Sequence, residues 1–123
     1  MIDHLKLFVA DPAASRAFYE RALAPLGYRV LMEPVPGVVG MGPEQQPYFW
    51  LAAAEGPATT CHVAFAAGST ETVDAFHAAA LAAGGTDNGE PGMRTKYHPR
   101  YYGAFVLDPD GNNVEAVFHG AGA

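Results

Sequence analysis

Apolar and polar residues alternate over residues 2–9, and this pattern predicts a β-strand with one face on a core. The apolar face holds every second residue of the segment: Leu5, Leu7 and Val9. His4 and Lys6 belong to the opposite face. The chain therefore begins with a strand that presents a histidine and a lysine away from its core.

A short helix is predicted directly after this strand. Asp11 is a favourable N-cap, and Pro12 suits the first helical position because an N–H group there would have no partner in the helix. Apolar residues then recur at the spacing i, i+4, i+7: Tyr19, Leu23 and Leu26. Pro25 makes the helix end at or before Ala24, with Gly27 just beyond.

The chain repeats this strand and helix. Shifted by 58 positions, residues 4–27 align without a gap on residues 62–85, and 7 of the 24 positions are identical. His4 aligns with His62, and both copies change at the same point from alternation to a helical pattern. The sequence thus predicts a duplicated unit with a histidine at the same place in each copy.

Three further strands are expected to complete each unit. In the first half, short apolar runs are interrupted by Pro and Gly: YRVLMEPVP, GVVGMG and PYFWLAAAE. In the second half, Ser69 caps the helix and a Gly/Pro-rich loop, GGTDNGEPG, precedes three segments: MRTKYH, YYGAFVLD and NNVEAVFH. The predicted fold class is α+β, with two tandem βαβββ modules, residues 1–56 and 57–123, forming a curled mixed sheet around a central cavity in one domain.

Composition narrows the classes of partner. Half of the 123 residues are hydrophobic and 16% are charged, as expected for a compact globular protein. The net charge of −6 makes nucleic acid an unfavourable partner, because no general basic surface is available for phosphates. The sequence has no apolar run long enough for a membrane span, so we expect a soluble, cytoplasmic protein. With Cys61 as its single cysteine, the chain forms no internal disulfide.

Three residues are candidate metal ligands. Alternation along the last strand places Glu115 on its more polar face, as it does His4 and His62 on theirs. Two imidazoles and one carboxylate suit a divalent first-row metal, namely Fe(II), Mn(II), Zn(II), Co(II) or Ni(II), and leave positions open for substrate. Against this, a single strand histidine is more often packed or solvated than metal-bound.

Basic and aromatic residues concentrate in the segment MRTKYHPRYY, residues 93–102. Its candidate substrate-binding residues are Arg94, Tyr97, His98, Arg100 and Tyr101. They suit an anionic or aromatic substrate over the mouth of the cavity, and they equally suit an ordinary solvated surface. Lys6 and Trp50 are further candidates for the cavity wall, although Trp50 also suits a core position.

Three stretches, HLKLFVADPAASRAFYERAL, CHVAF and FVLDPDGNNVEAVFH, resemble the vicinal oxygen chelate superfamily. This superfamily includes glyoxalase I, extradiol dioxygenases, fosfomycin-resistance thiol transferases and bleomycin-resistance proteins. The resemblance implies paired βαβββ modules around a metal, with ligand positions at His4, His62 and Glu115. Glyoxalase I has a fourth ligand on the last strand of the first module, where this chain has Phe49, Trp50 or Leu51.

Two functions remain open from the sequence. The first is a metal-dependent enzyme that chelates neighbouring oxygens of a small substrate, by isomerase or lyase, thiol-transferase or dioxygenase chemistry. The second is a protein of the bleomycin-resistance kind, which sequesters an aromatic compound without metal or catalysis. A homodimer is expected, and the two modules that form one cavity belong either to one chain or to two.

Overall fold

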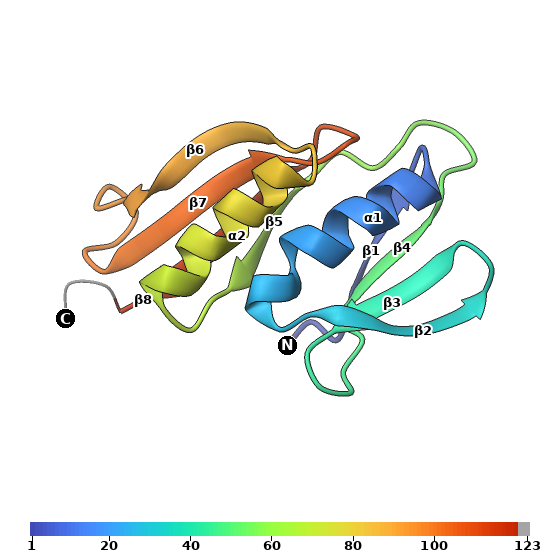
Figure 1. Cartoon of the computed structure of the whole chain (residues 1–123), viewed down its shortest axis with the longest axis horizontal. Coiled ribbons are helices and arrows are strands. Elements are labelled where there is room, and N and C mark those ends of the chain that lie inside the picture. Colours follow the sequence, from blue (N-terminus) through green and yellow to red (C-terminus); the bar gives the residue numbers. More distant parts are fainter. Residues whose placement is uncertain (121–123) are drawn as a thin grey trace.

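The computed structural model describes residues 1–120, so the last three residues of the expected second module lie outside the described part. Two four-stranded sheets form the protein, in the strand orders β1-β4-β3-β2 and β5-β8-β7-β6. Helices α1 and α2 lie side by side on the same side of the two sheets (Figure 1). Within residues 1–120, no helix covers the opposite face of either sheet.

Each sheet arises from one copy of the repeat. The first comprises β1 (Leu5–Val9), α1 (Pro12–Ala22), the 3-10 turn η1 (Ala24–Leu26), β2 (Arg29–Val35), β3 (Val38–Gly42) and β4 (Phe49–Ala53). The second comprises β5 (His62–Ala66), α2 (Thr70–Ala82), β6 (Thr86–Met93), β7 (Tyr101–Leu107) and β8 (Asn113–His119). The predicted α+β class with two repeated modules is confirmed, and the mixed sheet is present as two open pieces.

Local sequence signals explain both helices. The Asp11 carboxylate accepts a hydrogen bond from the Ala14 N–H at 3.2 Å, and the Ser69 hydroxyl accepts one from the Thr72 N–H at 3.1 Å. The first helix ends at Ala22, before the proline that limits it. Neither helix in the described part of the chain is long and apolar enough to cross a membrane.

Strand β6 is the main difference from the sequence prediction. Residues 84–92 were expected to form a loop and the segment MRTKYH a strand, but β6 covers Thr86–Met93 and residues 95–97 form a turn. As the outermost strand, β6 pairs only with β7, and its register shifts at Gly89. An irregular edge strand tolerates glycine and proline, because the N–H that Pro91 lacks needs no partner there.

One hydrophobic core joins the two modules. The rings of Phe49 on β4 and Phe65 on β5 lie 5.2 Å apart, edge to face. Gly85 lies where the second module packs against α1: a Cβ atom there would lie 2.5 Å from Val106 Cγ1 and 2.8 Å from Phe18 Cε1. A side chain at position 85 would therefore push α1 away from the second module.

A buried polar cluster links the same two modules. The Tyr19 hydroxyl on α1 donates a hydrogen bond of 2.5 Å to Asp108, in the turn between β7 and β8. Asp108 also accepts hydrogen bonds from the N–H groups of Asp110 and Asn112 and from the Asn112 amide. In turn, the Asn112 side-chain oxygen accepts the Cys61 N–H at 2.7 Å, next to the first residue of β5. The DPDGNN turn thus fixes β5 and α1 as well as joining two strands.

Replacement of Tyr19 by phenylalanine removes one donor from the buried Asp108 carboxylate. We expect the free energy of unfolding to fall by about 1–3 kcal/mol, as for a buried hydrogen bond to a charged group. Chemical denaturation measures this change. Tyr28→Phe is the matched control, since no hydrogen bond of the Tyr28 hydroxyl is found within residues 1–120, and it should change stability by less than about 0.5 kcal/mol.

The same variant should alter the alkaline limb of the stability profile. Burial and the neighbouring Asp108 raise the pKa of Tyr19 well above its ordinary value. Above about pH 10 the unfolded chain therefore binds fewer protons than the folded one, and the stability of the wild type falls as pH rises. Tyr19→Phe should lose less stability over this range, and equal slopes for the two proteins would contradict the assignment.

Candidate functional site

His62 and Glu115 lie next to each other on the open face of the second sheet. His62 opens β5, and Glu115 is in the neighbouring parallel strand β8, opposite Ala64. His62 Nε2 lies 2.6 Å from Glu115 Oε1. The Glu115 carboxylate is 1% exposed, whereas about half of the His62 side chain is accessible. A ligand from solvent can therefore reach the pair at the imidazole.

Tyr101 holds the other oxygen of this carboxylate. Its hydroxyl donates a hydrogen bond to Glu115 Oε2 from strand β7. Gly103 makes room for this arrangement, because a Cβ atom there would lie 3.1 Å from Tyr101 Cε1 and 3.4 Å from Glu115 Oε2. Burial, followed by the hydrogen bond to Glu115, raises the pKa of Tyr101, so the hydroxyl keeps its proton and remains a donor at neutral pH.

His4 belongs to the other sheet. It precedes β1, its Nδ1 lies 2.7 Å from Asp3 Oδ1, and about half of its side chain is exposed. A cavity of about 240 Å³ adjoins it, lined by Asp3, His4, Lys6, Gln46, Pro47, Tyr48 and Trp50. Across residues 1–120, no three His, Cys, Asp or Glu side chains are grouped closely enough to hold a metal ion. Within one chain, His62 and Glu115 are thus brought together and His4 is not.

The strand register identifies Trp50 as the counterpart of Glu115 in the first module. Trp50 pairs with Lys6, just as Glu115 pairs with Ala64, and Lys6 aligns with Ala64 in the repeat. The indole covers Gly40, where a Cβ atom would lie 2.8 Å from the ring, and Trp50 Nε1 donates to the Pro47 carbonyl at 2.9 Å. The first module therefore offers an aromatic wall where the second offers a carboxylate.

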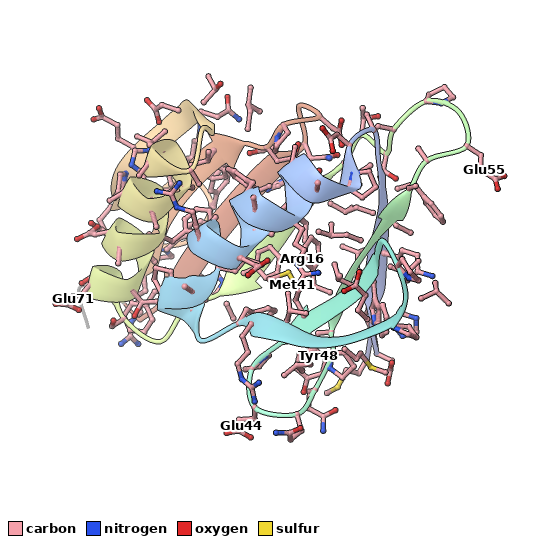
Figure 2. The ribbon with its side chains drawn as sticks, turned by 45° about the vertical axis from the view of Figure 1, so that its right-hand side comes forward. Arg16, Met41, Glu44, Tyr48, Glu55 and Glu71 are labelled. Atoms are coloured by element: carbon pink, nitrogen blue, oxygen red, sulfur yellow. The ribbon has the colours of Figure 1, made fainter. Side chains whose placement is uncertain are left out.

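Glu55 does not replace the missing carboxylate. It lies at the outer end of the loop after β4 (Figure 2). Because β1 and β4 are parallel with Leu5 opposite Phe49, His4 lies at the start of the sheet and Glu55 beyond its far end. Glu55 lies six residues beyond Phe49, two of them after the end of β4, and therefore well away from His4.

A second cavity, of about 350 Å³, adjoins the His62 and Glu115 pair. It is lined by Asn88, Gly89, Arg94, Lys96, Tyr97, Phe105 and Asn113. Phe105 pairs with Glu115 across β7 and β8, and its ring centre lies 6.1 Å from that of His62. Asn113 is directly opposite His62 in β5. The cavity and the polar pair therefore share a wall.

The candidate substrate residues separate into four places. Lys6 and Trp50 line the cavity beside His4, Arg94 and Tyr97 line the cavity beside His62, and Tyr101 contacts Glu115. His98 and Arg100 line neither cavity. They lie between β6 and β7, where His98 Nδ1 accepts the Arg100 N–H at 3.0 Å.

Several lining residues were missed in the sequence analysis. Tyr48 and Phe105 alternate with Trp50 and Tyr101, so the period-two pattern of their strands was an available signal. Asn88 lies in a segment that looked like a loop. Its position depends on the pairing of β6 with β7, for which the local sequence carries no signal.

Known proteins support the fold. The family described as the Glyoxalase/Bleomycin resistance protein/Dioxygenase superfamily matches residues 1–116. A solved glyoxalase/bleomycin resistance protein from Albidiferax ferrireducens T118 is 32% identical, with a TM-score of 0.80, 94% of this chain covered and 96% of that one. No curated protein matches the chain.

Two further solved structures show the same fold at lower identity. An enzyme of the glyoxalase/bleomycin resistance protein/dioxygenase family from Burkholderia phytofirmans PsJN is 20% identical, with a TM-score of 0.71, 96% of this chain covered and 98% of that one. The oxidase ChaP-H2 is 23% identical, with a TM-score of 0.72, 100% of this chain covered and 96% of that one. These two likenesses concern the fold alone.

A double-mutant cycle tests the contact between Tyr101 and Glu115. We expect Tyr101→Phe and Glu115→Gln to be coupled by about 0.5–3 kcal/mol in unfolding free energy, because both changes act on one buried hydrogen bond. In the control cycle, Tyr97→Phe replaces Tyr101→Phe and should give coupling below about 0.5 kcal/mol. Equal coupling in the two cycles would show that Tyr101 does not hold the carboxylate.

Proposed function

The chain belongs to the Glyoxalase/Bleomycin resistance protein/Dioxygenase superfamily, and on this premise we propose a divalent-metal-dependent enzyme that chelates neighbouring oxygens of a small substrate. The superfamily includes metal-dependent glyoxalases and dioxygenases. The observation that carries the proposal is the adjacent His62 and Glu115, one buried carboxylate beside an accessible imidazole on an open sheet face.

The chemistry of this pair fits a first-row divalent metal. Imidazole nitrogen and carboxylate oxygen are common ligands of Fe, Mn, Zn, Co and Ni, and His62 Nε2 and Glu115 Oε1 lie 2.6 Å apart, close enough to bind one ion together. Tyr101 holds the second carboxylate oxygen, so Glu115 Oε1, the oxygen beside His62 Nε2, is the one that would bind a metal.

The third proposed ligand, His4, comes from a second copy of the chain. Within residues 1–120 it joins neither His62 nor Glu115, although the repeat places it at the equivalent position of its own module. A homodimer that apposes the first module of one copy and the second module of another would unite the two halves. It would also cover Phe8 and Tyr48, apolar side chains that are 47% and 44% exposed.

Each half supplies a different part of the proposed mechanism. A bound metal would act as a Lewis acid that polarises two substrate oxygens. Glu115 and His62 would hold it, Trp50 would wall the cavity opposite them, and Lys6 would offer a positive charge beside His4. Isomerase or lyase chemistry, epoxide opening by a thiol, and dioxygenation are the reactions compatible with such a site.

A metal-free binding protein is the second candidate function. The cavity beside His4 favours it, because Tyr48 and Trp50 line that cavity together with the acidic Asp3. Aromatic faces and a carboxylate suit a cationic aromatic ligand. Such a protein would need no metal, so metal binding distinguishes the two candidates.

Metal analysis of the purified protein is the first test. We expect Mn(II), Fe(II), Zn(II), Co(II) or Ni(II) to bind, and His62→Ala or Glu115→Gln to weaken binding at least tenfold, on the order of the loss of one ligand or its orientation. His98→Ala is the matched control, because His98 is far along the chain from the proposed ligands and lines neither cavity. Failure of all five metals, or equal binding by His62→Ala, would favour the binding protein.

Complementation between two inactive variants tests the dimer. Neither His4→Ala nor His62→Ala alone should bind metal tightly. If the site joins two chains, a mixed dimer of these variants contains one intact site, and random mixing should restore about a quarter of the wild-type capacity. No recovery after subunit exchange, shown by native mass spectrometry with one variant isotope-labelled, would place all ligands in one chain.

A further inference from the structure

We propose that the cavity lined by Arg94, Lys96, Tyr97 and Phe105 binds a carboxylate group of the substrate, so that the ligand is a small aromatic or unsaturated carboxylic acid. This rests on the proposed function in one respect: the end of the acid away from Arg94 would lie at His62 and Glu115. The carboxylate site itself is formed within the second module.

The Arg94 guanidinium is held in place before any ligand binds. Its Nη2 donates a hydrogen bond of 2.6 Å to the Glu90 carbonyl, and its Cζ lies 5.4 Å from the centre of the Phe105 ring. Gly89 and Gly92 have no side chains, so the Arg94 guanidinium can approach the backbone of β6 closely. A Cβ atom at either glycine would lie 3.2 Å from a guanidinium nitrogen. Little side-chain entropy is therefore left to lose when a ligand binds.

The positive charge on this cavity has no acidic partner. Throughout residues 1–120, the ion pairs are formed by Arg16 and by histidines, and no carboxylate lies within salt-bridge distance of Arg94 or Lys96. Lys96 Nζ instead lies 5.1 Å from the centre of the Tyr97 ring. In a protein with 13 acidic and 7 basic residues, two unpaired cations on one cavity favour an external anion.

The geometry favours a carboxylate among the anions. One part of the guanidinium is bonded to Glu90, and the remaining N–H groups form a planar edge that matches the two oxygens of a carboxylate. The rings of Tyr97 and Phe105 supply apolar walls. A volume of about 350 Å³ suits a molecule of the size of a substituted benzoate.

The other end of such a ligand faces the proposed metal ligands. The Arg94 guanidinium lies over the Phe105 ring. The centres of the Phe105 and His62 rings are 6.1 Å apart. Asn88 and Asn113 form a hydrogen bond of 3.2 Å at the same wall, and Asn113 is the strand partner of His62. A flat acid anchored at Arg94 would thus extend along Phe105 towards the polar pair.

Binding of benzoate to protein freed of metal on a chelating resin, monitored by NMR titration, tests this proposal without metal. We expect millimolar or tighter binding of benzoate and at least tenfold weaker binding of benzamide, its neutral isostere. Arg94→Gln should weaken benzoate binding at least tenfold, which corresponds to a loss of about 1.4 kcal/mol or more. Arg100→Gln is the matched control, since Arg100 lies close in sequence but outside the cavity, and should bind benzoate as the wild type does.

Further variants and ligands distinguish loss of the carboxylate site from a folding defect and from a site for another anion. Arg94→Lys keeps the charge without the planar edge, and should bind benzoate more weakly than the wild type but more tightly than Arg94→Gln. Lys96→Gln should weaken binding a fewfold. Equal binding of benzoate and benzamide, an unchanged affinity in folded Arg94→Gln, or tighter binding of inorganic phosphate than of benzoate would overturn the proposal. Because the protein is free of metal throughout, these outcomes are independent of whether it binds metal.

Discussion

The buried carboxylate of Asp108 is the contact on which the arrangement of both modules depends. Its two oxygens accept four hydrogen bonds, one of them from Tyr19 in the other module. A carboxylate that is 6% exposed would be costly without such partners. Asp108 orients Asn112, whose side-chain oxygen accepts the Cys61 N–H. This bond fixes the position of β5 along β8, so that His62 lies beside Glu115. A turn outside the site thereby fixes the register of the site.

Duplication produced two similar scaffolds with different chemistry. Lys6 and Ala64 occupy equivalent positions, yet their partners on the next strand are Trp50 and Glu115. The second module alone can bury a carboxylate, because Tyr101 and His62 satisfy both of its oxygens. The first presents an aromatic wall and one histidine. This difference makes the halves complementary, and it agrees with the proposed joining of one module from each of two copies.

Much of the fold followed from short-range signals. The N-caps at Asp11 and Ser69, the strand alternation and the repeat itself predicted both helices and most strands, since each depends on backbone geometry within a few residues. The same alternation placed His62 and Glu115 on the more polar faces of their strands, and repeat symmetry related His62 to His4 rather than to Glu115. In the structure His62 contacts Glu115, while the role of both residues as ligands stays a proposal.

The sequence by itself determined the two modules, their helices and the face on which each candidate residue lies, because these properties follow from the periods of helix and strand. Only the tertiary structure decided which faces meet. It paired β6 with β7 against the local propensity of residues 84–92, and it left His4 on a sheet separate from Glu115. It also placed Arg94 on Phe105 beside His62. These relations join residues that are distant in the chain, and they depend on packing between strands rather than on any local pattern.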